Sequence, residues 1–262
     1  MPKSPVPVGA YGCGSPIRLP VVQAMAIGSQ ADFFYPEENP TYQGGDSIVW
    51  GLIRGAQQLM IETNNSGCHF YQMDNAYFGR NKYYRISKNA LQLSKFIDHS
   101  GNHRCELIFK ELGINILPWN HNRNGPIILC LSSHHLYAYY GITAQQWIDS
   151  TVAKIRKYTD RAISIRDKDL DPLNPIQSEI KNAWCVVTHV SAAALDALLL
   201  GIPVITTGDC AASPLSTTFQ EIDSPSMAEG RAALFASLSW GQFTPAEMHS
   251  GLAWEVLTHR NL

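Results

Sequence analysis

Residues 185–206 have the sequence CVVTHVSAAALDALLLGIPVIT, and this stretch decides the fold. It begins and ends with short apolar runs, which predict strands buried on both faces, as in a parallel sheet. Between them, Ser191 is a suitable helix N-cap, and the alanine- and leucine-rich segment after it favours a helix. Gly201 and Pro203 end that helix. The stretch therefore predicts a strand–helix–strand unit of an α/β protein.

Length and composition indicate a folded protein with a sizeable core. The chain has 262 residues, of which 45% are hydrophobic and 16% charged, and this composition argues against disorder. No apolar run reaches the roughly 18–20 residues needed to cross a bilayer, and residues 1–5 do not lead into a signal peptide. The six cysteines are scattered and contain no Cys-x-x-Cys pair, so they predict neither a zinc site nor a disulfide framework. The expected location is the cytoplasm.

The net charge of −2 is unevenly distributed along the chain. Residues 1–79 carry a net charge of −3, residues 80–123 of +5, and residues 124–262 of −4. A basic middle segment between acidic flanks can attract an anionic partner. A solvated surface is the simpler alternative for a segment of this charge.

The predicted elements are less regular before residue 120 than after it. The first part has predicted strands over 6–12, 21–28 and 68–74, a helix over 47–60, and helical or irregular segments over 89–97 and 105–113. The polar stretch 120–126 is a predicted linker, which divides the chain into 1–122 and 123–262. After it come predicted strands over 127–131 and 162–166 and helices over 144–159 (capped by Thr143), 176–183, 231–238 and 245–256.

Polar side chains follow three strands of the predicted parallel sheet, and we expect them to bind a diphosphate. They are Ser132, Ser133, Arg166, His189 and Ser191. The carboxyl ends of parallel strands lie at one edge of a sheet, where hydroxyls, a guanidinium and a helix amino terminus suit phosphate groups. A strand–helix–strand unit that binds nothing is the alternative.

Two candidates at this edge have specific structural alternatives. Arg166 could form a surface ion pair with Asp167 or Asp169 instead of contacting a phosphate. Asp196 lies within the helix of the 185–206 stretch, where it could accept hydrogen bonds from ribose hydroxyls. It could equally be a partner in a helix cap.

Two carboxylates in the first half are candidates for a general base. Asp74 ends a predicted strand before a glycine-containing loop, which is a suitable place for a base in a cleft. An Asx-turn with Asn75 is its alternative role. Asp46 is the second candidate, and its simpler role is the N-cap of the helix predicted over 47–60.

A basic, aromatic stretch follows Asp74. Arg80, Lys82 and Arg85 are interleaved with four aromatic residues, Tyr77, Phe78, Tyr83 and Tyr84. This pattern could contact the phosphates and stacked bases of a nucleic-acid acceptor. The alternative is that the aromatic rings pack inward while the charges stay solvated.

Common cofactor motifs are missing from the sequence. Gly12-Cys13-Gly14 is too short for a dinucleotide fingerprint, and no Walker, Gly-x-Ser-x-Gly or His-Glu-x-x-His motif occurs. Adjacent histidines, His134 and His135, do not have the spacing of a metal site. We therefore expect no cofactor and no metal.

The segments 186–191 and 196–204 resemble the donor-site motif of GT-B glycosyltransferases, in which a serine-containing loop precedes a helix with the pattern Glu-Ala-Leu-x-x-Gly-x-Pro-Val. Asp196 stands where many members have glutamate. The stretch 74–91 also resembles bacteriophage proteins that carry this same second half. Compact phage transferases of this architecture modify hydroxymethylated pyrimidines in DNA.

The resemblance implies an α/β fold with two Rossmann-like lobes and a cleft between them, the second lobe the more regular. Residues 1–122 would bind the acceptor, and residues 123–262 a nucleotide-sugar, expected to be UDP-linked. Asp74 would activate the acceptor hydroxyl. The leading candidate for the acceptor molecule is double-stranded phage DNA in the host cytoplasm. A polysaccharide acceptor, a sugar-nucleotide epimerase and a non-catalytic nucleotide-binding protein are the alternatives.

Overall fold

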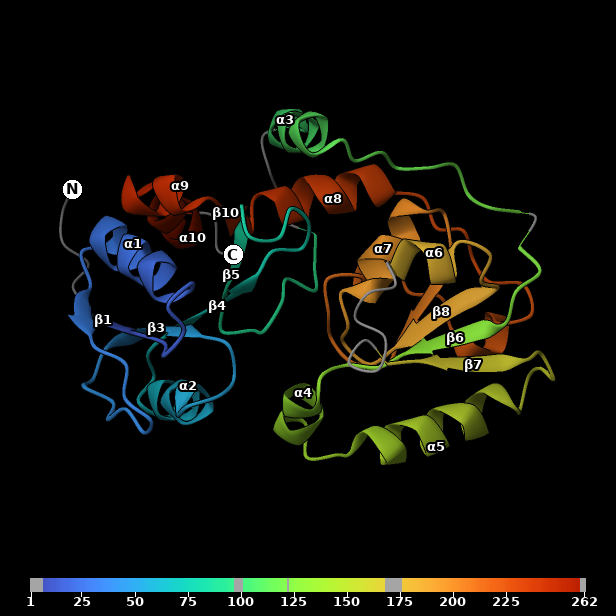
Figure 1. Ribbon diagram of the computed structural model, residues 1–262, viewed down its shortest axis with the longest axis horizontal. Coiled ribbons are helices and arrows are strands. Elements are labelled where there is room, and N and C mark those ends of the chain that lie inside the picture. The colour runs from blue at the N-terminus through green and yellow to red at the C-terminus, as the bar shows by residue number, and fades with distance from the viewer. Residues whose placement is uncertain (1–6, 97–100, 122, 168–175, 260–262) are drawn as a thin grey trace. The chain divides into compact units, whose positions relative to one another are not determined.

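The computed structural model describes residues 7–96, 101–121, 123–167 and 176–259 (Figure 1). The chain forms two compact units. The first contains the described residues up to Leu93 and those from Ser237 onward. The second contains Ser94–Phe96 and the described residues from Gly101 to Ala236. Each unit has its own sheet and its own apolar core.

The first unit has a mixed six-stranded sheet in the order β10-β5-β4-β3-β1-β2. Its strands are β1 (Val8–Tyr11), β2 (Asp32–Phe34), β3 (Asp46–Trp50), β4 (Phe70–Asn75), β5 (Tyr84–Lys88) and β10 (Gln242–Phe243). Strands β2, β1, β3 and β4 are parallel, whereas β5 is antiparallel to both of its neighbours. One face is covered by α1 (Leu19–Ser29), α9 (Pro245–His249) and α10 (Leu252–His259), and the other by α2 (Ala56–Asn65) (Figure 1).

Two predictions for the first unit are wrong. The predicted strand over 21–28 belongs to α1, which packs against both the sheet and the C-terminal helices. A helix with apolar contacts on several sides lacks a clear polar face, so the helical period is hidden. The predicted helix over 47–60 is strand β3 followed by α2, because β-branched Ile48 and Val49 are buried in the sheet and Gly51 turns the chain at φ 66°.

The second unit has a fully parallel sheet in the order β7-β6-β8-β9. Its strands are β6 (Ile127–Cys130), β7 (Ile163–Arg166), β8 (Cys185–Thr188) and β9 (Val204–Thr206). Helices α4 (His134–Tyr139) and α5 (Ala144–Ile155) lie on one face, and α6 (Ile176–Ile180) and α7 (Ala193–Leu199) on the other (Figure 1). The predicted strand–helix–strand unit is confirmed as β8-α7-β9, and Thr143 caps α5 in a capping box.

The compact units do not follow the predicted division at residue 122. Phe109 of α3 (His103–Leu112) contacts Phe235 of α8 (Arg231–Ser239), with ring centroids 5.6 Å apart, within the second unit. The predicted linker is also part of that unit, since the Asn120 amide donates to the Gly201 carbonyl and the Arg123 side chain donates to the Trp184 carbonyl.

The C-terminal helices belong to the first unit, not to the second as predicted. Met248, Ala253 and Leu257 are fully buried in the same core cluster as residues of α1. The predicted helix over 245–256 is two helices, because Gly251 adopts φ 88° between α9 and α10. Within the described part of the chain, none of the helices has both the length and the apolar character needed to cross a membrane.

Candidate functional site

The strands of the second unit end together at one edge of its sheet. In the register, Cys130 of β6 pairs with Arg166 of β7 and with Thr188 of β8, and Thr188 pairs with Thr206 of β9. The predicted polar groups therefore follow strands that stop at the same level. This is the edge at which parallel α/β sheets bind their ligands.

Hydrogen bonds join the two central loops at this edge. The Val190 amide donates to Ser132 Oγ (3.2 Å), and the Thr188 hydroxyl donates to the Cys130 carbonyl (2.7 Å). Ser132 thus holds the loop that carries His189. The structure brings Ser132 and His189 together, although the Ser132 hydroxyl already accepts a hydrogen bond from the Val190 backbone amide.

His189 is the central side chain of the edge. It is only 8% exposed, and Nδ1 lies 3.0 Å from Thr207 Oγ1. Thr207 Oγ1 also accepts a hydrogen bond from Trp147 Nε1 (2.8 Å). The Thr207 hydroxyl can donate its own proton to Nδ1, and in that tautomer the imidazole proton lies on Nε2. Nε2 is buried and has no hydrogen-bond partner among the described residues.

The surroundings of the His189 ring hold it in place and keep it neutral. Tyr137 lies parallel to it with centroids 6.0 Å apart, and Tyr140 meets it edge-on at 4.6 Å. A methyl group on Gly208 would come within 2.7 Å of the ring, so glycine permits this packing. Burial lowers the pKa of His189, because desolvation disfavours the imidazolium.

Two further predicted donor residues serve helix starts. Ser133 is the N-cap of α4 and accepts from the Leu136 amide (3.4 Å). Ser191 accepts from the Ala193 amide (3.3 Å), but the N-cap of α7 is Ala192, one residue later than predicted. Both hydroxyls thus accept from backbone amides, and their roles in donor binding stay predictions.

The remaining predicted donor residues have protein partners. Arg166 forms an ion pair with Glu179 of α6 (Nε to Oε2, 3.0 Å). This partner is a helix residue, and Asp169 lies outside the described residues. Asp196 Oδ1 accepts from Gln177 Nε2 (2.8 Å), which joins α6 to α7. Its predicted contact with a ribose is not tested by this arrangement.

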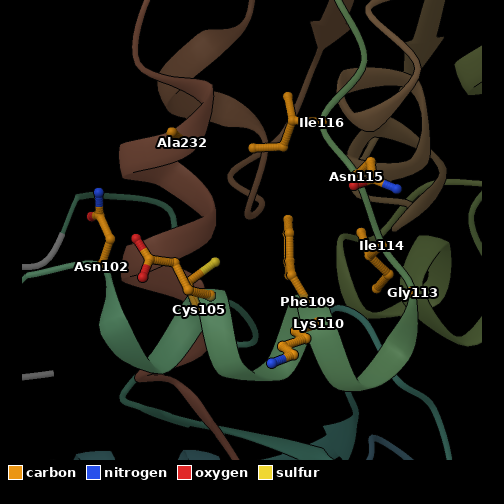
Figure 2. A pocket seen from close by; sticks show the side chains of 10 residues that line it. Asn102, Cys105, Phe109, Lys110, Gly113, Ile114, Asn115, Ile116 and Ala232 are labelled. Atoms are coloured by element: carbon orange, nitrogen blue, oxygen red, sulfur yellow. The ribbon is translucent and has the colours of Figure 1, made fainter.

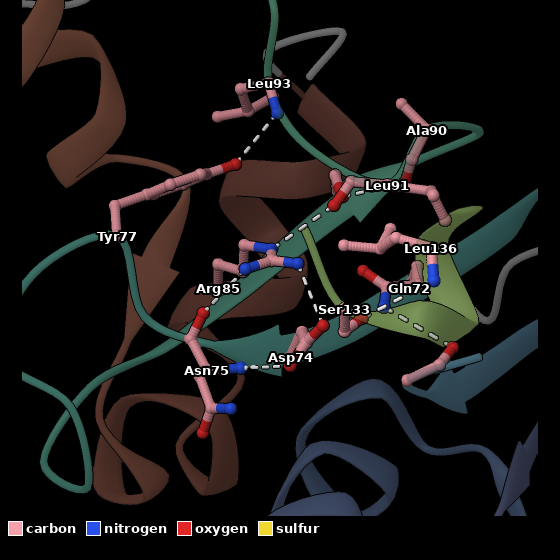
Figure 3. A network of polar contacts seen from close by, with 12 residues as sticks. Gln72, Asp74, Asn75, Tyr77, Arg85, Ala90, Leu91, Leu93, Ser133 and Leu136 are labelled. Carbon is pink, nitrogen blue, oxygen red and sulfur yellow. Dashed lines mark hydrogen bonds and ion pairs between the residues drawn. The ribbon is translucent and has the colours of Figure 1, made fainter. Parts of the chain in front are cut away.

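In the first unit, Asp74 lies near the carboxyl end of β4 and is held by two hydrogen bonds (Figure 3). Oδ2 accepts from Arg85 Nη2 (2.9 Å), and Oδ1 accepts from the backbone N–H of Asn75 (2.7 Å). Arg85 also donates to the carbonyls of Asn75 and Leu91 and is buried. Its guanidinium thus links backbone and carboxylate inside the unit, and its role in acceptor binding stays a prediction.

Asp46 lies at the opposite edge of the same sheet. It starts β3 and does not cap a helix, and its Oδ1 accepts from the His69 amide (2.8 Å). Because β3 and β4 are parallel, the amino end of β3 is far along the strand direction from Asp74. The structure does not bring the two predicted carboxylates together, and the expected helix cap at Asp46 is wrong.

The basic, aromatic stretch divides into buried rings and exposed charges. All four aromatic residues are buried: Tyr77, Phe78, Tyr83 and Tyr84. The alternative that the rings pack inward is therefore confirmed, and they do not form an exposed stacking surface. Arg80 and Lys82 are exposed, and their role in acceptor binding stays a prediction.

A separate hollow of about 600 Å³ lies in the second unit along α3 (Figure 2). Phe109 rises from α3 toward Ile116, with Cys105 and Lys110 on the same helix. No predicted site residue lines it. In the described part of the chain, no group of three or more histidine, cysteine, aspartate or glutamate side chains could hold a metal.

Sequence reasoning missed Thr207 and Tyr140, which complete the surroundings of His189. Thr207 had a usable signal, because it directly follows a predicted strand of the parallel sheet, as His189 does. Tyr140 had none, since its contact depends on how α4 packs. The sequence analysis also did not select Arg18 of the first unit, whose guanidinium donates to Asn75 near the carboxyl end of β4.

Comparisons with known proteins support the fold. No protein-family model and no curated protein matches the sequence. The structure is similar to two solved structures from Thermosulfurimonas dismutans, KpsC beta Kdo 2,4 transferase and KpsC beta Kdo 2,7 transferase. The first has a TM-score of 0.51 at 12% identity and covers 88% of this chain and 89% of its own. The second has a TM-score of 0.54 at 13% identity, with coverages of 94% and 98%. The predicted fold class, α/β with two Rossmann-like units, is confirmed.

Proposed function

We propose that this chain is a glycosyltransferase that moves a sugar from a nucleotide-linked donor to a hydroxyl acceptor. The observation that carries the proposal is the buried His189 Nε2, which has no partner among the described residues and lies where the strands of a Rossmann-like parallel sheet end. A buried polar nitrogen without a partner is costly unless a ligand or a water molecule supplies the hydrogen bond, and a phosphate would supply it here. Similarity to two Kdo transferases in fold favours sugar transfer over other uses of this edge.

The proposed chemistry assigns a role to each unit. The acceptor oxygen forms a bond with the anomeric carbon while the bond from that carbon to the phosphate oxygen breaks. The nucleotide leaves with the electron pair, so negative charge grows on its phosphate. His189 Nε2–H donates to that phosphate, and stabilisation of growing charge is a major source of catalysis. The acceptor proton passes to a base, for which Asp74 of the first unit is the candidate.

A thermal-shift series tests the donor. UDP-, GDP-, CMP- and dTDP-linked sugars are compared, with CMP-linked Kdo as the CMP donor because the two neighbours are named Kdo transferases. A ligand that binds only the folded state at about 100 times its Kd adds about 2.7 kcal/mol of stability, so Tm rises. The corresponding free sugars are the controls. If no donor shifts Tm beyond its free sugar, the proposal fails.

Substitutions at His189 test its contact with phosphate. His189→Asn keeps a polar atom near Nδ1 and removes Nε2, whereas His189→Gln places an amide near the Nε2 position. We expect donor affinity to fall about tenfold or more in the asparagine variant and less in the glutamine variant, because a hydrogen bond to a charged group contributes about 1.5–3 kcal/mol. Equal affinities for wild type and both variants would remove His189 from the site.

The same contact predicts a pH dependence. Burial lowers the pKa of His189 in the unliganded protein, whereas a neighbouring phosphate favours the imidazolium and raises the pKa in the complex. Donor binding then takes up a proton, so affinity is expected to increase between about pH 8 and about pH 6. Calorimetry in buffers of different ionisation enthalpy measures the uptake. The His189→Gln variant should lose this pH dependence.

The acceptor is proposed to be a saccharide hydroxyl, since both structural neighbours are named as Kdo transferases. The alternative acceptor is a hydroxymethylated pyrimidine of phage DNA, whose phosphates would contact the exposed Arg80 and Lys82. Its phosphate contacts would make binding salt-dependent. Retention on duplex DNA that weakens steeply with salt, and that is lost in an Arg80→Gln/Lys82→Gln variant, would favour DNA over a saccharide.

A further inference from the structure

A hollow of about 220 Å³ lies in the first unit beside the carboxyl ends of β1 and β3. It is lined by the loop after β1, including Cys13, and by the segment from Val49 to Ala56. Its volume is below the roughly 300–1,000 Å³ of sites for drug-sized ligands. The hollow therefore suits a small molecule or one end of a larger one.

The charged groups that line this hollow are both cationic. They are Arg18 and Arg54, and the lining contains no aspartate or glutamate. Both guanidinium charges act on the Cys13 thiol and lower its pKa, although burial outweighs them and the net shift is upward. Two positive charges thus converge on one small space without an acid in its lining.

Among the described residues, the groups that hold Arg18 in place are neutral. Nη2 donates to Asn75 Oδ1 (2.8 Å) and Asn81 Oδ1 (3.3 Å), and Nη1 donates to the Tyr84 hydroxyl (3.3 Å). The guanidinium also lies over the Trp50 ring, 5.4 Å from its centroid. These contacts fix its orientation but do not neutralise its charge, which favours an anionic ligand.

Arg54 reaches the hollow through an unusual backbone conformation. Its φ is 55°, in the left-handed region that non-glycine residues rarely adopt. Its Nη1 lies against Gly14, where an added methyl group would approach to 2.1 Å. The Arg54 guanidinium thus lies over Gly14 at the rim of the hollow.

We propose that this hollow binds the anionic group of a sugar-sized ligand, a carboxylate or a phosphate, between Arg18 and Arg54. The hydrogen bond from Arg18 to Asn75 connects the hollow to the carboxyl end of β4, the strand that also carries the proposed base Asp74, although Asp74 does not line the hollow. The ligand is then the acceptor, which makes the acceptor an acidic saccharide. That last identification rests on the proposed function, whereas the anion site does not.

Three matched ligands test the site by calorimetry without any nucleotide-sugar. Glucuronate and glucose 6-phosphate carry the two kinds of anion, and glucose is the neutral control. We expect either or both anions to bind at least tenfold more tightly than glucose, and the one that binds identifies the source as a carboxylate or a phosphate. If neither anion exceeds glucose, the proposal is overturned.

Charge-removing variants then locate the binding. Arg18→Gln and Arg54→Gln should each lower anion affinity about tenfold or more, a difference of about 1.4 kcal/mol. Lys88→Gln is the matched control, since Lys88 ends β5 beside Tyr71, near the amino end of β4 and at the opposite edge of the sheet. Arg54 is exposed, so its variant remains informative if Arg18→Gln does not fold. Affinity that is unchanged in Arg54→Gln, or that falls as much in Lys88→Gln, would overturn the site.

The two proposals can fail separately. Arg54-dependent binding of glucuronate with no response to any nucleotide-sugar would leave the anion site standing and remove the glycosyltransferase. A donor response without preferential binding of either anion would do the reverse.

Discussion

An Asp74→Asn variant is expected to lose about 10²- to 10⁴-fold in turnover while it still binds the nucleotide-linked donor. Asparagine has nearly the same shape as aspartate but cannot take the acceptor proton. Donor binding is assigned to the second unit, so it should not depend on this side chain. Single-turnover sugar transfer, measured together with donor Kd, separates the two effects.

The ion pair of Asp74 with Arg85 requires a control for stability. Removing the carboxylate leaves the buried guanidinium without its 2.9 Å partner, which is expected to cost about 1–2 kcal/mol because the Asp74 side chain is partly exposed. Turnover is therefore referred to the folded fraction found by denaturation. If Asp74 serves only this ion pair, stability falls but the turnover of folded molecules does not.

Two further variants sharpen the assignment. Asp74→Glu keeps a carboxylate, displaced by one methylene, and should recover part of the lost turnover. Asp46→Asn changes the other predicted carboxylate, whose Oδ1 accepts from the His69 amide, a bond that asparagine can keep. Turnover should survive in Asp46→Asn. Its loss there, with normal turnover in Asp74→Asn, would reverse the roles of the two residues.

The second unit was predictable because its signals are local. Its parallel strands are short apolar runs, and its helices begin at residues such as Thr143 and end at residues such as Gly201. The meeting of Ser132 with the His189 loop followed from the rule that parallel strands end at one edge. The partnerless Nε2 of His189 was not predictable, since it depends on which neighbours the folded chain brings to the ring.

The first unit was harder to predict because its important contacts join distant residues. Arg18 bonds to Asn75, 57 residues away, and Arg85 was mistaken for a surface residue although it pairs with Asp74 across β4 and β5. The segment ending at Gly28 was predicted as a strand because its contacts with α9 come from more than 200 residues later in the chain. The residue pattern within a short sequence window does not predict contacts with residues so far away in the chain.

Gly28 gives the strongest expected effect on stability. It lies inside α1, where an added methyl group would come within 1.8 Å of the Met248 carbonyl oxygen and 2.9 Å of the Gly251 nitrogen. Both atoms belong to the backbone of the C-terminal helical segment and cannot rotate away. Although alanine favours a helix by about 1 kcal/mol over glycine, we expect Gly28→Ala to lower the free energy of unfolding by about 2–3 kcal/mol, because overpacking usually costs more.

A matched glycine distinguishes this close approach from a general effect of alanine. Gly67 follows α2 at φ 74° with no atom within 4 Å of an added methyl group, so Gly67→Ala bears only the left-handed backbone cost of about 1 kcal/mol. Urea denaturation gives both free energies, and limited proteolysis shows where the chain loosens. In Gly28→Ala, cleavage should increase first in the segment from Thr244 to His259, since the methyl group separates α9 from α1. Equal stability of the two variants, or cleavage confined to the second unit, would mean that the contact between α1 and α9 does not hold the C-terminal helices on the first sheet.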